Sequence, residues 1–148
     1  MDSASRYLRM ETPDKADHLW RYTPWKKVHP TGDLSEIPTL GQPEISLNLI
    51  DGSKAPNGIE LKPGGSGEPD FSMSSALTNS FLHASAKDSQ WTLVVDRGFS
   101  PGKPVILDIK ASDFPSIAHI SLEIGKMAEF ELITRVTGNS EWFGLLRT

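Results

Sequence analysis

The C-terminal part of the chain is a succession of short apolar segments separated by Gly, Pro or Asn, and this feature limits the fold most. The segments are WTLVV at 91–95, VILDI at 105–109, AHISLEI at 118–124, AEFELIT at 128–134 and a last one at about 141–146. Their centres recur about every 11 to 14 residues, which is typical of short β-strands. This spacing fits a β-sandwich and the rungs of a β-helix, and spacing alone does not choose between them.

Apolar and polar side chains alternate in two of these segments, as they do in strands that bury one face. The inward set is Ile120, Leu122, Ile124, Phe130 and Leu132, and the outward set is His119, Ser121, Glu123, Glu129 and Glu131. The segment 91–95 is nearly all apolar, which predicts a strand buried on both faces.

The composition of the 148 residues is that of a globular protein, with 37% hydrophobic and 23% charged residues. This length predicts one domain, or one domain with an appendage. The 12 Gly and 11 Pro residues favour short strands and turns over a helical bundle. A net charge of −4 argues against nonspecific binding to nucleic acid or anionic lipid, because both require a surplus of Lys and Arg.

The chain has no cysteine, which excludes a disulfide framework, a thiolate nucleophile and a thiolate-ligated zinc or iron–sulfur site within it. The N-terminus lacks the apolar segment of a signal peptide. No window reaches the roughly 18 consecutive apolar residues of a membrane-spanning helix. These features predict a soluble, cytoplasmic protein.

The first 90 residues mix helix and strand signals. Pro13 and Asp14 predict the start of a short helix that ends before Pro24, and a spacing of four between Met73, Leu77 and Phe81 predicts a helix over 73–84. Strands are expected at 45–50 and 59–62, with turns at Asp51-Gly52 and Asn57-Gly58 and a surface loop over 63–70.

The predicted fold class is therefore α+β, mainly β, with short N-terminal helices and one mid-chain helix before the C-terminal strands. The expected domains are an N-terminal α+β region over 1–90, which wraps over another surface, and a β-rich region over 91–148. These regions can also form one continuous domain.

The segment DHLWRYTPWKKV at 17–28 crowds two tryptophans, a tyrosine and three basic residues around one proline. Its run WRYTP, preceded by an acidic residue, resembles the N-terminal signature of the SufB/SufD family of the Suf iron–sulfur cluster assembly machinery. Residues 77–109 look like the helix–strand–turn–strand unit of that family. Residues 119–138, with Gly125 and Ala128 at the turn, are similar to the first rungs of its right-handed parallel β-helix.

The resemblance implies the start of a right-handed β-helix and a non-catalytic scaffold or assembly role in iron–sulfur cluster biogenesis. It also implies a SufB/SufD-type protomer and a SufC-type ATPase complex as partners. The cysteine and histidine positions of the family and its SufC docking surface belong to later rungs, so none is carried over. We interpret the chain as an N-terminal portion or a short relative, and we expect it to pair with itself or a partner through the strands around 142–146.

Particular residues also suit other functions. Arg21, Tyr22, Trp25, Lys26 and Lys27 suit stacking on single-stranded nucleic acid, but packing with solvated lysines is the favoured interpretation. A small β-rich ligand- or carbohydrate-binding module that uses Trp25, Trp91 or Trp142 is the alternative function.

Catalytic chemistry has weak signals. His119 with Glu123, near Glu129 and Glu131, can bind a metal or move protons, but a solvated strand face explains the same pattern. His18, His29 and His83 lack metal-ligand spacing, and Ser72, Ser74, Ser75 and Ser80 lack a nucleophile elbow. The glycines of PGGSG lack the lysine of a phosphate-binding loop. We therefore predict no catalytic, cofactor-binding or metal-binding residue and no enzymatic activity.

Overall fold

The computed structural model describes residues 8–11, 16, 41–65, 88–113, 116–139 and 143–148. The helices expected at about 13–20 and over 73–84 lie outside the described residues, as does the aromatic segment 17–28. All described strands belong to one compact unit, formed by Leu40–Pro69 and Asp88–Thr148.

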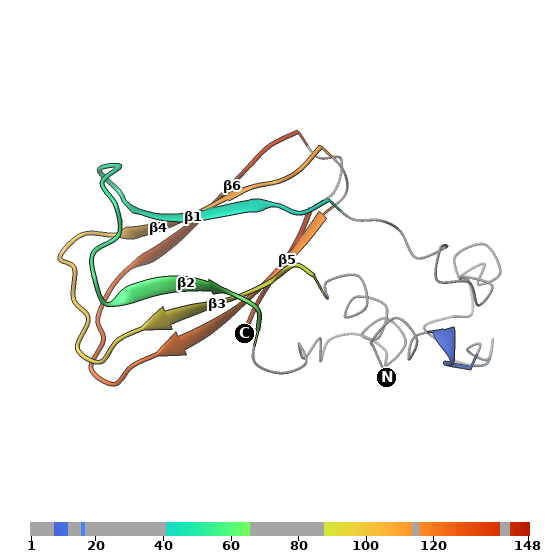
Figure 1. Ribbon diagram of the computed structural model, residues 1–148, viewed down its shortest axis with the longest axis horizontal. Coiled ribbons are helices and arrows are strands. Elements are labelled where there is room, and N and C mark those ends of the chain that lie inside the picture. The colour runs from blue at the N-terminus through green and yellow to red at the C-terminus, as the bar shows by residue number, and fades with distance from the viewer. Residues whose placement is uncertain (1–7, 12–15, 17–40, 66–87, 114–115, 140–142) are drawn as a thin grey trace. The chain divides into compact units, whose positions relative to one another are not determined.

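The described residues form seven strands in two sheets, which Figure 1 shows facing each other. The first sheet has the order β1 (Glu44–Leu49), β4 (Val105–Lys110), β6 (Leu132–Thr137). The second has the order β2 (Ile59–Pro63), β3 (Gln90–Val95), β5 (Ser116–Ile124), β7 (Phe143–Arg147).

The predicted α+β class is wrong for this part of the chain. Its elements are strands in two mixed sheets, and helices contribute no element to the described residues. The physical reason lies in the breaks: Gly, Pro and Asn leave regular segments of five to nine residues. Segments of that length are marginal as helices but sufficient for strands that pair with neighbours.

From β3 onward the chain alternates between the two sheets and stacks on itself. β5 pairs in parallel with β3, β7 with β5, and β6 with β4. The offset is 27 residues in the β4–β6 ladder (Val105 with Leu132) and the β5–β7 ladder (Ser116 with Phe143), and 29 residues in the β3–β5 ladder (Gln90 with His119). We call each passage of the chain through both sheets a coil. The stacked parallel coils are compatible with the rungs of a β-helix and differ from the antiparallel sheets of an immunoglobulin-type sandwich.

β1 and β2 complete the sheets at the other side of the stack. β1 pairs antiparallel with β4, and β2 pairs antiparallel with β3. These two strands come from the region that the sequence analysis assigned to 1–90, and they share sheets with strands of 91–148.

The expected strands lie close to the observed ones, with one clear shift. The strand expected at 128–134 runs instead from Leu132 to Thr137. Residues 125–131 connect β5 in one sheet to β6 in the other, so the first half of the alternating segment is a crossing rather than a strand.

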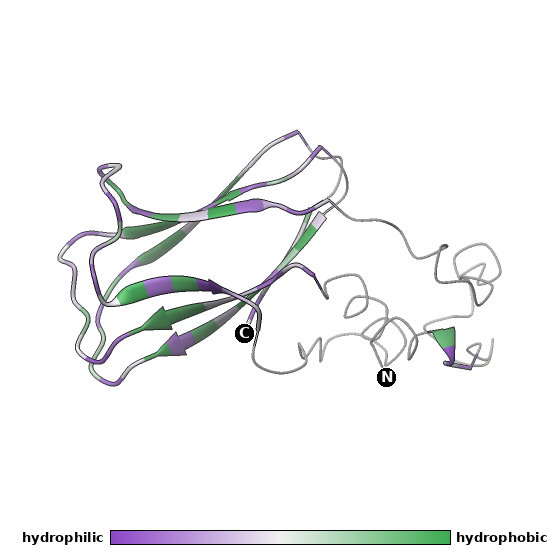
Figure 2. Cartoon of the chain, viewed as in Figure 1, coloured by the Kyte–Doolittle hydropathy of each residue, from purple (hydrophilic) through white to green (hydrophobic). Residues whose placement is uncertain are grey.

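The core lies between the inward faces of the two sheets. Val105, Leu107 and Ile109 of β4 and Leu93 and Ile120 of the facing sheet are completely buried. Figure 2 shows the hydrophobic positions alternating with polar ones along the strands. Each such side chain contributes about 1.5 to 3 kcal/mol through burial. The predicted inward set is confirmed at Ile120, whereas Ile124 is exposed at the end of its strand.

The turns stack as closely as the strands do. Backbone hydrogen bonds join Gly125 N to Val95 O at 2.7 Å and Gly98 N to Lys126 O at 3.0 Å. At Gly125 a Cβ atom would lie 2.5 Å from the backbone N of Arg97. Gly125 does not have a positive φ, so backbone conformation is not the reason for a glycine at this position. Glycine is required there because the two turns approach each other closely.

We predict that Gly125→Ala lowers the free energy of unfolding by about 2 to 3 kcal/mol, because backbone atoms must move apart to admit the methyl group. Gly52→Ala is the matched control. Gly52 has open space around its Cβ position and a φ of 83°. Its replacement costs about 1 kcal/mol, from backbone conformation alone. Urea unfolding followed by circular dichroism measures both, and equal losses would contradict the close contact.

Candidate interaction surfaces

The last strand of each sheet offers a pairing edge. Within the described residues, β6 pairs only with β4 and β7 pairs only with β5. An edge strand carries a row of backbone N–H and C=O groups that another strand can pair with. The same end also exposes apolar side chains: Val136 of β6 is 45% exposed and Leu145 of β7 is 37% exposed.

Both residues share the core-facing side of their strands. Val136 pairs with the completely buried Ile109, and Leu145 alternates with Phe143, which packs against the core. They are exposed because no described strand lies beyond them. The apolar interior therefore continues to this end of the stack.

At the opposite side of the stack, the edge strand β2 is protected against pairing. β2 carries Glu60, Lys62 and Pro63, and all three are exposed. Proline and charged residues on an edge strand oppose pairing with another chain. β6 and β7 contain no Pro, Lys, Asp or Glu, and β7 ends in the exposed Arg147. The charge of Arg135 on β6 is paired with Asp108 of β4, with Nη2 and Oδ2 2.9 Å apart. The edge of β2 thus resists strand pairing more strongly than the edge of β6 does.

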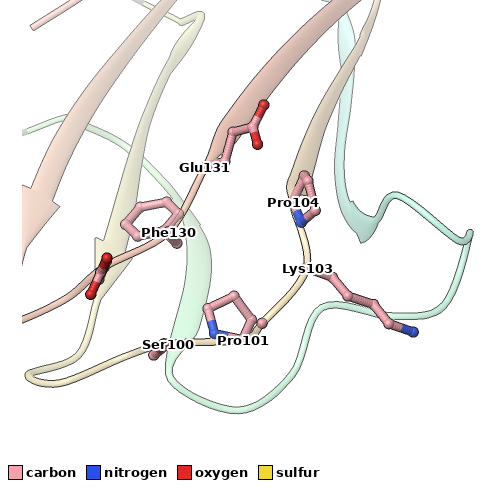
Figure 3. Close-up of a pocket in the computed structure, with 8 residues that line it drawn as sticks. Ser100, Pro101, Lys103, Pro104, Phe130 and Glu131 are labelled. Atoms are coloured by element: carbon pink, nitrogen blue, oxygen red, sulfur yellow. The ribbon is translucent and has the colours of Figure 1, made fainter.

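A groove of about 480 Å³ lies where two stacked turns meet. Residues 100–104, between β3 and β4, form one wall, and residues 129–131, before β6, form the other. Figure 3 shows Pro101, Pro104 and Phe130 around the hollow and Glu131 at its rim. Its lining thus combines the apolar surfaces of Pro101, Pro104 and Phe130 with two glutamates on one wall.

Lys103, the one basic residue of the lining, points away from the groove. Its Nζ lies 2.7 Å from Oδ2 of Asp51, in the turn after β1. The hydrogen bond from Lys103, together with those from the Ser53 hydroxyl and backbone N–H, holds the pKa of Asp51 well below its ordinary value of 3.8. The lysine charge is therefore balanced outside the groove.

His119 occupies a buried polar row on the outward face of β5. It is 2% exposed, and the neighbouring Ser121 is 7% exposed. Nε2 of His119 lies 3.0 Å from Oγ1 of Thr148, which is also 3.4 Å from Oγ of Ser121. The solvated-face interpretation is therefore wrong for His119 and Ser121, while Glu123 is exposed as expected.

The structure does not join His119 to the glutamates expected near it. β5 lies in one sheet, whereas Glu129 and Glu131 precede β6 of the other and line the groove. Among the described residues, no group of histidines and carboxylates could hold a metal ion. His18, His29, His83, the four serines of 72–80 and most of the glycine-rich loop lie outside the described residues.

The tryptophans of the ligand-binding alternative are only partly described. Trp91 is half-buried and shares the core-facing side of β3 with Leu93 and Val95. Trp25 and Trp142 lie outside the described residues. The described chain thus offers no exposed tryptophan for stacking on a sugar ring.

Comparisons with protein-family models, with curated proteins and with solved structures gave no match. The SufB/SufD resemblance therefore stays a prediction. In the described part of the chain, no helix combines the length and hydropathy needed to cross a membrane.

The groove is the feature that sequence reasoning missed. The outward positions of Glu129 and Glu131 were readable from alternation, and both are exposed. Nothing in the sequence indicated that residues 100–104 lie beside them, because this neighbourhood depends on the stacking of successive turns.

The pKa of Asp51 gives a pH-dependent prediction. Because the folded-state pKa is lowered, the stabilisation is complete above the unfolded pKa near 3.8 and is lost as the pH falls toward the folded value. Asp51→Asn should lower the thermal midpoint at pH 7, and the gap to the wild type should narrow below pH 3.8. Asp113→Asn, at another exposed aspartate, is the control; a gap that is constant with pH would contradict the assignment.

Burial gives His119 a structural role, which predicts that His119→Ala destabilises the fold. Loss of a buried ring and of its bond to Thr148 should cost about 2 kcal/mol or more of unfolding free energy. Lys110→Ala, at an exposed strand position, should change it by less than about 0.5 kcal/mol. Chemical denaturation measures both, and a fully stable His119→Ala protein would refute the structural role.

Proposed function

We propose that the chain is a non-catalytic, SufB/SufD-like scaffold or assembly component of iron–sulfur cluster biogenesis, working in the cytoplasm. The observation that carries the proposal is the stack of parallel coils, whose last strands β6 and β7 have a free side within the described residues. The run WRYTP and the order of elements after it supply the family resemblance.

In this proposal the chain binds its partner by pairing of edge strands. A partner strand beside β7 or β6 gains backbone hydrogen bonds and covers the apolar side chains of Val136 and Leu145. The partner is a SufB/SufD-type protomer or a second copy of this chain. By family analogy, a SufC-type ATPase joins the assembly that results.

A second copy related by a two-fold axis would place its edge strand antiparallel to the first. In this arrangement the edge strand of one copy pairs with the same edge strand of the other copy. The apolar side chains at the β6 and β7 end of each core then face each other. The charges and the proline of β2 oppose strand pairing at that edge.

This proposal predicts concentration-dependent self-association that a charge at the pairing end removes. The double variant Val136→Lys and Leu145→Lys should weaken association by about 10-fold or more, because lysine at an edge opposes strand pairing and apolar burial. Ile50→Lys is the control, since Ile50 is 57% exposed and lies outside β6 and β7. Sedimentation equilibrium over a wide concentration range measures the mass of each protein.

A wild-type chain that stays monomeric throughout would contradict pairing between copies. The family role is tested separately, by mixing the chain with a purified SufB-type protomer and SufC-type ATPase and following comigration in gel filtration. Comigration that the double variant loses and Ile50→Lys keeps is the expected result. Failure of the wild type to comigrate would count against the family role.

A further inference from the structure

The groove between residues 100–104 and 129–131 is a fixed feature of the stacked turns. Backbone bonds join Glu129 N to Phe99 O and Val105 N to Glu131 O, each at 2.9 Å. The rings of Phe99 and Phe130 meet edge to face, with centroids 5.5 Å apart. Phe99 is buried in the core, so Phe130 is held by a residue that cannot move freely. The groove is therefore shaped before any ligand arrives.

The floor suits an aliphatic or planar group. Pro101, Pro104 and Phe130 are half-buried, and each presents an apolar surface to the hollow. The methylene stem of a long basic side chain packs well on such a surface while its charged head stays near water. The ring of Phe130 can add a cation–π contact of the kind that arginine makes most often.

One wall of the groove, residues 129–131, supplies unbalanced negative charge. Glu129 and Glu131 are both exposed, and neither forms an ion pair within the described residues. Lys103 does not compensate for them, because Asp51 holds its ammonium group on the other side. The groove lining therefore offers a cationic partner two carboxylates, one on each side of Phe130 in the sequence, and neither has an ion-pair partner among the described residues.

We propose that this groove binds an arginine side chain presented by an extended segment of a partner polypeptide. A guanidinium group can bond a carboxylate through two parallel hydrogen bonds and lie flat on proline and aromatic surfaces, which a lysine ammonium cannot do. The volume of about 480 Å³ lies within the range of small-ligand sites and leaves room for the residues that flank the arginine. This site is separate from the β6 and β7 edges and independent of the scaffold proposal.

The test uses the full chain, labelled with ¹⁵N, and the peptide acetyl-Pro-Arg-Pro-amide as the probe. Binding with a dissociation constant of about 1 mM or tighter is expected. The amide signals of residues 100, 102–103 and 129–131 should shift. Replacement of arginine by the neutral isostere citrulline should weaken binding by about 10-fold, since the carboxylates then lose their charged partner. Raising the salt concentration should weaken it as well.

Matched variants assign the binding to the groove. Glu129→Gln and Glu131→Gln keep the side-chain size, and each should raise the dissociation constant of the peptide by about 3-fold or more. Glu60→Gln makes the same charge change on exposed β2 and should leave the affinity unchanged. Circular dichroism of each variant confirms that the fold is retained.

Three results would overturn the proposal. The first is that no amide signal at the groove shifts at about 10 mM peptide, which is 10-fold above the expected dissociation constant. The second is that the citrulline peptide binds as tightly as the arginine peptide. The third is that Glu60→Gln weakens peptide binding as much as Glu129→Gln and Glu131→Gln do. Binding of N-acetylarginine methylamide as tightly as the peptide would overturn the polypeptide part and identify a small-amine site. A lysine peptide that binds more tightly than the arginine peptide would overturn the choice of guanidinium.

Discussion

The parallel pairing of strands 27 or 29 residues apart is the constraint on which the rest of the structure depends. It places each coil on the preceding one with inward side chains in line, so that Val105 meets Leu132 and Ile109 meets Val136. Because the backbone hydrogen bonds fix this register, a slip of one residue would turn every inward side chain outward. The core, the turns and both candidate surfaces follow from that alignment.

The candidate surfaces arise at the two kinds of place that a stack of coils leaves open. Stacked turns cannot fill all the space beside them, and here they leave a groove between Pro101 and Phe130. At the β6 and β7 end, no further described strand covers the interior, and Val136 and Leu145 are exposed there. A polar groove rim suits recognition of a charged partner, whereas an apolar edge suits assembly.

Sequence reasoning succeeded where a local signal decided the outcome. Strand positions followed from alternating side chains between Gly, Pro and Asn, and β4 begins at Val105 as expected. The prediction of a strand at 128–134 was wrong in its first half, because the residues before Leu132 cross from one sheet to the other despite their alternating pattern. Sequence reasoning was also wrong about His119, because alternation tells which face a residue occupies and not whether that face is covered.

The sequence by itself determined the short strands, the turn residues and the sign of the charges at Glu129 and Glu131. These depend on backbone conformation and side-chain type, which act over a few residues. Only the tertiary structure decided that the strands stack in parallel, that Asp51 draws Lys103 away from the groove, and that β6 and β7 lack a second partner strand among the described residues. Those outcomes depend on contacts between residues more than 25 positions apart, and local patterns carry no information about which distant segments will meet.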